Sequence, residues 1–107
     1  MVETVRALEA SLPVISKTGV IVYGRNNVLW SLRNEPQKIK VLILARNTPP
    51  GLDEEIKSIA EEKGIPIFKS RRSNLELGSL CGRPHSISVL AIYDFGGAPI
   101  DEETINA

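Results

Sequence analysis

The fold is decided by residues 39–68, which read IKVLILARNTPPGLDEEIKSIAEEKGIPIF. The stretch begins with almost continuous apolar residues as far as Ala45, a pattern typical of a strand that is covered on both faces. A stiff proline turn follows, and then an amphipathic helical pattern ends at Gly64, a residue that favours helix termination. A short apolar run, Ile65 to Phe68, closes the stretch. These features predict a strand–helix–strand unit of an α/β fold.

The alternation continues toward the N-terminus. Apolar residues at helical spacing predict a first helix over residues 2–11, which Pro13 breaks. A β-branched run over residues 20–24 predicts a strand and a tight turn. The next helix follows at once, and we expect Asn26 or Asn27 to cap it by accepting a hydrogen bond from a free backbone N–H.

The alternation also continues toward the C-terminus. Ser73 and Glu76 have the spacing of a capping box, which predicts a helix that Gly82 ends. Residues 86–95 form the last predicted strand, which we expect to run antiparallel to its neighbours. Four helices alternating with four strands predict a central mixed four-stranded sheet with helices on both faces.

The composition is that of one folded domain. The chain has 107 residues, of which 42% are hydrophobic and 24% charged, and 13 basic side chains balance 13 acidic ones. No run approaches the ~20 apolar residues of a membrane helix, and the N-terminal sequence is unlike a signal peptide. A single cysteine cannot form an internal disulfide, which fits a reducing cytosol. We expect one domain over residues 1–97 and an acidic tail over residues 98–107.

Arginines gather around the ends of the predicted strands. Arg25, Arg46 and the pair Arg71 and Arg72 follow the first three strands, and Arg83 precedes the last. The carboxyl ends of parallel strands share one edge of a sheet, and the start of an antiparallel strand joins them there. The same turns carry polar side chains suited to base edges or stacking, namely Asn26, Asn27, Asn47 and His85. The sequence therefore predicts a basic rim that suits RNA.

The motif CGRPH, Cys81 to His85, has a catalytic interpretation that we weigh against a structural one. Cys81 lies on the predicted inner face of its helix and near the helix C-terminus, where the dipole opposes a thiolate. His85 has no partner at the spacing of metal ligands. We therefore expect inert packing for Cys81, and no catalytic residue, metal, cofactor or small-molecule substrate.

Several short motifs occur together in a fixed order, namely ARN at 45–47, GIP at 64–66, LELG at 75–78, CGRPH at 81–85 and SV at 88–89. In this combination the chain resembles the ribosomal protein L30e family of the large subunit in archaea and eukaryotes. That family belongs to the kink-turn-binding group that includes ribosomal protein L7Ae. The resemblance covers about residues 18–95, and it implies a three-layer α/β/α sandwich.

The resemblance implies a protein without enzymatic activity that binds a kink-turn, a sharply bent RNA with tandem sheared G·A pairs. Contacts would come from the start of the second helix, the turn after the second strand and the loop before the last strand. In this sequence these places hold Gly24, Arg25, Asn26 and Asn27, then Arg46 and Asn47, then Arg83, Pro84, His85 and Ser86. The resemblance further implies a cytoplasmic ribosomal protein, monomeric off the ribosome, with ribosomal RNA and neighbouring ribosomal proteins as partners.

Two alternatives stay open at this point. The first is a core protein of another ribonucleoprotein, such as a guide-RNA modification particle, which would use the same fold and the same rim. The second, which we rank lower, is a small hydrolase that uses Cys81 as its nucleophile.

Overall fold

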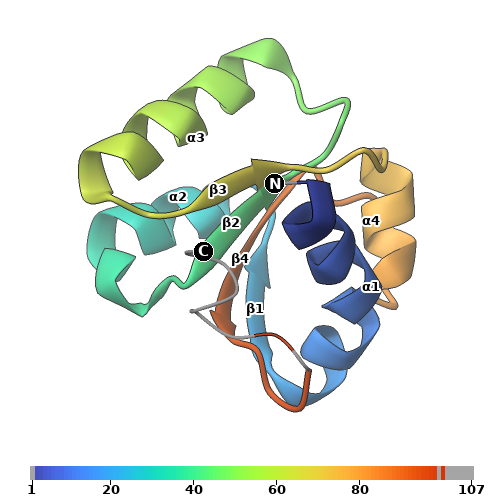
Figure 1. The fold of residues 1–107 in the computed structure, drawn as a ribbon. Coiled ribbons are helices and arrows are strands. Elements are labelled where there is room, and N and C mark those ends of the chain that lie inside the picture. The colour runs from blue at the N-terminus through green and yellow to red at the C-terminus, as the bar shows by residue number, and fades with distance from the viewer. Residues whose placement is uncertain (1, 99, 101–107) are drawn as a thin grey trace.

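The computed structural model describes residues 2–98 and 100, and over these residues the elements alternate as predicted (Figure 1). The helices are α1 (Val2–Thr18), α2 (Arg25–Asn34), α3 (Pro50–Lys63) and α4 (Asn74–Leu80). The strands are β1 (Val20–Tyr23), β2 (Val41–Leu44), β3 (Ile67–Lys69) and β4 (Val89–Asp94). A short 3-10 turn, η1 (Pro36–Lys38), which the sequence did not predict, leads from α2 to β2. None of the described helices is long and apolar enough to cross a membrane.

The four strands form one mixed sheet in the order β1-β4-β2-β3. Strand β4 lies between β1 and β2 and is antiparallel to both, whereas β2 and β3 are parallel. The prediction of an antiparallel last strand is thus confirmed. Because β1, β2 and β3 all run one way, their carboxyl ends meet the start of β4 at one edge of the sheet.

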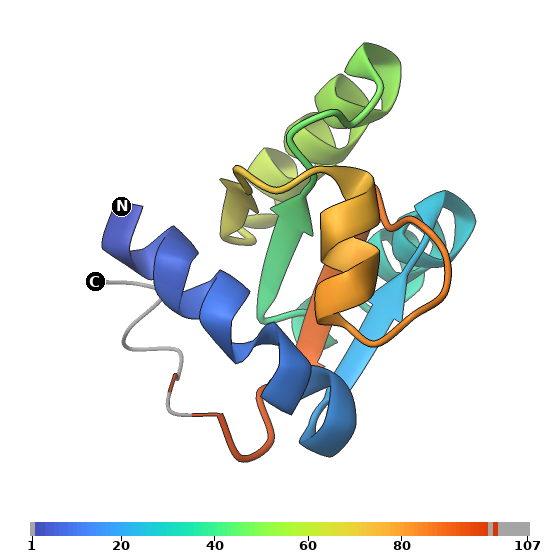
Figure 2. The ribbon, with the colours of Figure 1, turned by 90° about the vertical axis from the view of Figure 1, so that its right-hand side faces the viewer.

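Helices cover the sheet on both sides, with α1 and α4 on one face and α2 and α3 on the other (Figures 1 and 2). Strand β2 is fully buried because its side chains alternate between two cores. Val41 and Ile43 pack in the core beneath α1 and α4, which we call the first core. Leu42 and Leu44 pack in the second core, beneath α2 and α3. The predicted three-layer sandwich is confirmed.

Helix α1 is longer than predicted, because Pro13 lies inside it rather than ending it. A proline in a helix removes one backbone hydrogen bond and costs about 3 kcal/mol. Leu8 and Leu12 before the proline and Ile15 after it are all buried in the first core. Burying an aliphatic side chain contributes about 1.5–3 kcal/mol, so packing of the last turn outweighs the local cost.

The predicted acidic tail lies outside the described residues except for Ala98 and Ile100. Both of these residues pack against the first core, and Ile100 is 6% exposed.

Candidate RNA-binding surface

Backbone hydrogen bonds tie together the turns at the edge where the strands end. The Gly24 N–H donates to the Val89 carbonyl at 3.2 Å, and the Ala45 N–H donates to Ser88 at 2.8 Å. The Arg46 N–H donates to the Arg72 carbonyl, also at 2.8 Å. We call the surface formed by residues 24–27, 46–47, 71–72 and 83–86 the rim. All of these residues are exposed except Gly24, which is half-buried.

The prediction that Asn26 or Asn27 caps α2 is wrong, because the helix begins at Arg25, at least two residues earlier than such a cap requires. The N-cap is Gly24, with φ 93°, and no side chain caps the helix. A positive φ is accessible to glycine at little cost, and it places Asn26 and Asn27 within the first turn. Asn27 instead donates its Nδ2 to the Tyr23 carbonyl at 3.1 Å, so the amide is tied to the end of β1. Asn26 is exposed at the tip of the helix.

The loop before β4 lies directly on α4, and Figure 2 shows it passing beside the end of β1. The Arg83 N–H donates to the Gly78 carbonyl at 2.8 Å, and the Ile87 N–H donates to Asn74 at 2.9 Å. Gly78 permits this contact because a Cβ there would be 2.0 Å from the His85 carbonyl oxygen. The glycine of the LELG motif thus has a steric role in placing the loop.

Tyr23, a residue that sequence reasoning missed, supports two of the predicted contact residues. Its ring lies 5.4 Å from the His85 ring, with 36° between the ring planes. The Arg83 guanidinium carbon lies 5.1 Å from the centre of the same ring, within the range of a cation–π contact. Tyr23 is the last residue of β1, so its position at the strand end was the signal that could have found it.

The Asn47 side chain joins the turn after β2 to the start of α4. Its Nδ2 donates to Asn74 Oδ1 at 3.2 Å, and its Oδ1 accepts from the Asn74 N–H at 2.8 Å. Each amide atom has capacity for a second hydrogen bond, so Asn47 is held in place and still able to contact a base. Asn74 was not predicted as a site residue; its position directly after the cap residue Ser73 was the only hint.

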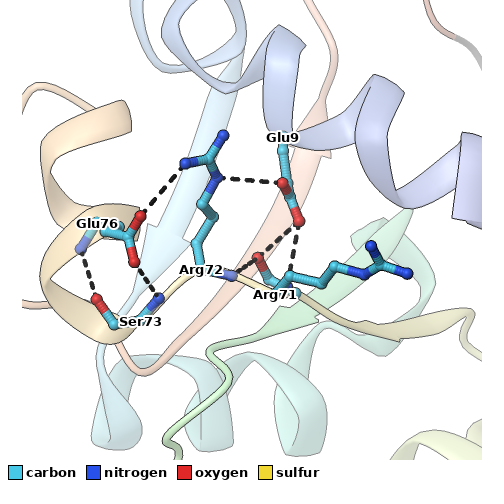
Figure 3. Close-up of polar contacts among 6 residues, drawn as sticks. Glu9, Arg71, Arg72, Ser73 and Glu76 are labelled. Carbon is cyan, nitrogen blue, oxygen red and sulfur yellow. Dashed lines mark hydrogen bonds and ion pairs between the residues drawn. The ribbon is translucent and has the colours of Figure 1, made fainter.

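The rim arginines differ in how far their charges are already paired. Arg72 lies 3.3 Å from a Glu76 oxygen and 3.4 Å from a Glu9 oxygen (Figure 3). Hydrogen bonds to these carboxylates, with Glu76 the stronger, raise the pKa of Arg72. Arg25 lies 3.8 Å from Glu55, but the arginine is exposed and the glutamate only half-buried, and such surface pairs contribute little. Among the described residues, ion pairs are lacking for the three other rim arginines, Arg46, Arg71 and Arg83.

The predicted capping box of α4 is confirmed and fixes the end of the turn that carries Arg71 and Arg72. Ser73 Oγ accepts from the Glu76 N–H at 3.2 Å, and a Glu76 oxygen accepts from the Ser73 N–H at 3.1 Å. The pKa of Glu76 is lowered, first by the Ser73 N–H and then by the Arg72 guanidinium.

Cys81 is buried in the first core, as predicted. Burial raises the pKa of its thiol, although the nearby Arg83 charge opposes the shift. A thiol with a raised pKa is a poor nucleophile at neutral pH. Within the described part of the chain, no three side chains of His, Cys, Asp or Glu gather where they could hold a metal ion.

The chain is similar in sequence to a family model and to several individual proteins. Residues 6–101 match a family model described as the ribosomal protein L7Ae/L30e/S12e/Gadd45 family. The chain is 34% identical to large ribosomal subunit protein eL30 of Aeropyrum pernix, over 94% of this chain and 99% of that protein. It is 32% identical to eL30 of Methanothermobacter thermautotrophicus, over 89% and 95% of the two chains. The chain therefore belongs to the ribosomal protein L7Ae/L30e/S12e/Gadd45 family.

Proposed function

We propose that this protein is a structural constituent of the large ribosomal subunit that binds and stabilises a kink-turn in ribosomal RNA through the rim. The observation that carries the proposal is the convergence of four separate turns into one exposed surface. This surface bears five arginines and three asparagines, and none of its residues is acidic. The large-subunit names of its relatives in several archaea support the same assignment.

The rim residues differ in chemistry, and each kind suits a different part of the RNA. Arg46, Arg71 and Arg83, which form no ion pair with other described residues, carry guanidinium groups whose planar forks suit phosphate oxygens. Asn26 offers a donor and an acceptor side by side, which suits the edge of an unpaired or sheared base. His85, backed by Tyr23, presents a ring on which a base that leaves the helical stack can rest. The backbone hydrogen bonds among the turns hold these groups in place before RNA arrives.

The proposal includes a cellular setting. The protein belongs to a family of ribosomal proteins, which is not a class of enzymes. It would act on the cytoplasmic ribosome, be monomeric when free, and contact ribosomal RNA and neighbouring ribosomal proteins. Sedimentation of the tagged protein from cells tests this setting, because migration with a guide-RNA particle instead of large subunits would favour the other ribonucleoprotein.

A gel-shift comparison tests the binding mode. The probes are a kink-turn RNA and a straight duplex RNA of equal length and charge. We expect the kink-turn to bind more tightly at every salt concentration, and we expect Asn26→Ala to weaken that complex by about 1–3 kcal/mol, the value of one good base contact. Equal affinity of the wild-type protein for the two RNAs would refute kink-turn recognition. Equal losses for Asn26→Ala on both RNAs would refute base reading by Asn26.

A further inference from the structure

A second basic surface adjoins the rim on the side of α1. It is a hollow of about 440 Å³ formed by α1, α4 and the turns after β2 and β3. Its charged lining consists of Arg6, Arg46, Arg71, Arg72, Glu9 and Glu76. The lining thus has an excess of two positive charges in a chain whose formal net charge is zero. We call this surface the arginine hollow.

The negative charge of Glu9 takes little from the positive charge of the arginine hollow, because its carboxylate already accepts hydrogen bonds from within the protein. Glu9 is only 9% exposed and accepts from Ser70 Oγ at 2.9 Å, the Arg71 N–H at 3.3 Å and Arg72 Nε at 3.4 Å (Figure 3). All three donors come from the turn between β3 and α4. Glu9 therefore fixes the arginine-bearing turn to α1, and its charge is offset from within the protein.

Three guanidinium groups are left for an external anion. Arg72 is shared between the carboxylates of Glu9 and Glu76, whereas Arg6, Arg46 and Arg71 form no ion pair with other described residues. All three are exposed, and Figure 3 shows the Arg71 side chain extending away from Arg72. Three unpaired guanidinium groups around one hollow suit the successive phosphates of a nucleic-acid strand better than a single small anion.

The position of the arginine hollow next to the rim indicates which part of a bound RNA it would contact. Arg46, Arg71 and Arg72 belong both to the rim and to the hollow, so the two surfaces are continuous. An RNA that bends at the rim has stems that must leave it, and a stem leaving toward α1 would bring its phosphates to the hollow. We propose, on the basis of the function proposed above, that the arginine hollow binds the backbone of a stem flanking the bend. Arg6 is the contact that lies outside the rim.

The test uses Arg6→Ala, with Arg33→Ala as the matched control. Both arginines are exposed, but Arg33 is in the last turn of α2, on the opposite face of the sheet. The probes are a kink-turn RNA with both stems long, versions in which one stem or the other is trimmed, and a straight duplex. We expect Arg6→Ala to weaken binding of the long-stem RNA several-fold and to lower the slope of log affinity against log salt by about 0.9. Trimming one particular stem should abolish the difference between Arg6→Ala and wild type.

Each other outcome has a distinct meaning. If Arg6→Ala behaves like Arg33→Ala on the long-stem RNA, or loses affinity equally for every trimmed version, the proposed stem contact is wrong. If Arg6→Ala instead loses binding of an oligoglutamate peptide while its RNA affinity is unchanged, the hollow is a site for acidic protein segments and the proposal is overturned. If the wild-type protein does not prefer the kink-turn to the straight duplex, the rim function itself fails. Thermal unfolding of both variants verifies that they are folded.

Discussion

At the scale of single residues, Tyr23 connects two proposed RNA-contact residues that are distant from it in sequence. An aromatic pair is worth about 0.5–1.5 kcal/mol, and an exposed cation–π contact about 0.5–1 kcal/mol. Tyr23 makes one contact of each kind, with His85 and Arg83. Both partners lie in the loop before β4, so the tyrosine limits the freedom of that loop before RNA binds.

We predict that Tyr23→Ala weakens kink-turn binding by about 1–2 kcal/mol, because His85 and Arg83 lose the ring that positions them. Fluorescence anisotropy with a labelled RNA measures the effect. Tyr23→Phe serves as the control, since it keeps the ring and removes only the hydroxyl. Equal losses for the two variants would assign the effect to the hydroxyl rather than to the ring.

The sequence was informative about which residues are exposed at the rim and less informative about what holds them. Arginines and asparagines next to strand ends could be placed at one edge from chain order alone. The attachment of Asn27 to Tyr23 could not be predicted, because it depends on the positive φ of Gly24. The ion pair between Arg72 and Glu9 joins residues far apart in sequence, and the sequence around either residue does not indicate it.

At the scale of elements, α4 and the loop after it form a unit whose spacing depends on Gly78. Alanine is favoured over glycine in a helix by about 1 kcal/mol. At Gly78, however, the added Cβ would be 2.0 Å from the His85 carbonyl oxygen. For Gly78→Ala, helix propensity thus predicts a gain in stability, whereas packing predicts a loss.

We predict that Gly78→Ala destabilises the protein by about 1–3 kcal/mol, because such crowding outweighs the gain in propensity. The displaced loop should also weaken RNA binding. Urea unfolding measures the first effect. Gly51→Ala is the control, since Gly51 is also helical but has nothing within 4 Å of an added Cβ, and we expect it to be neutral or slightly stabilising. A more stable Gly78→Ala protein would contradict the steric role.

The capping box of α4 gives a prediction about acid. The pKa of Glu76 is held below its ordinary value of 4.5, first by the Ser73 N–H. A carboxyl with a lowered folded pKa stabilises the fold fully above its unfolded pKa, and the stabilisation is lost as the pH falls through the folded value. We predict that the advantage of wild type over Glu76→Gln shrinks between about pH 5 and about pH 3.

The measurement is the midpoint of urea unfolding for both proteins across that pH range. Glutamine preserves an oxygen that can accept from the Ser73 N–H, so the variant isolates the carboxylate charge. If the urea midpoints of the two proteins change in parallel with pH, the carboxylate charge of Glu76 does not contribute to stability.

The elements also show where local rules fail. The capping box and the helix stop before Gly64 depend on neighbouring residues, and both were predicted. Helix α1 was predicted too short, because Pro13 is a strong local signal and the burial of Ile15 is a tertiary one. The turn η1 has no periodicity from which it could be predicted.

At the scale of the whole molecule, chain order predicted the architecture because alternating helices and strands have few ways to pack. The predicted position of the site depended on one assumption, namely that the last strand runs antiparallel to its neighbours. Its direction brings residues 83–86 to the edge where β1, β2 and β3 end. The order of the strands was not predicted, because the two cores accept apolar side chains from any of them.

The central place of β4 in the sheet affects when, during synthesis, the turns of the rim can come together. Of the four described strands, β4 is the last to leave the ribosomal exit tunnel, yet it pairs with both β1 and β2. A nascent chain that lacks it has its first strand separated from the β2–β3 pair, and its turns are not joined. The proposed RNA-binding surface is thus completed only when β4, the last of the four described strands, has been translated, so we expect a chain that stops before β4 to lack that surface.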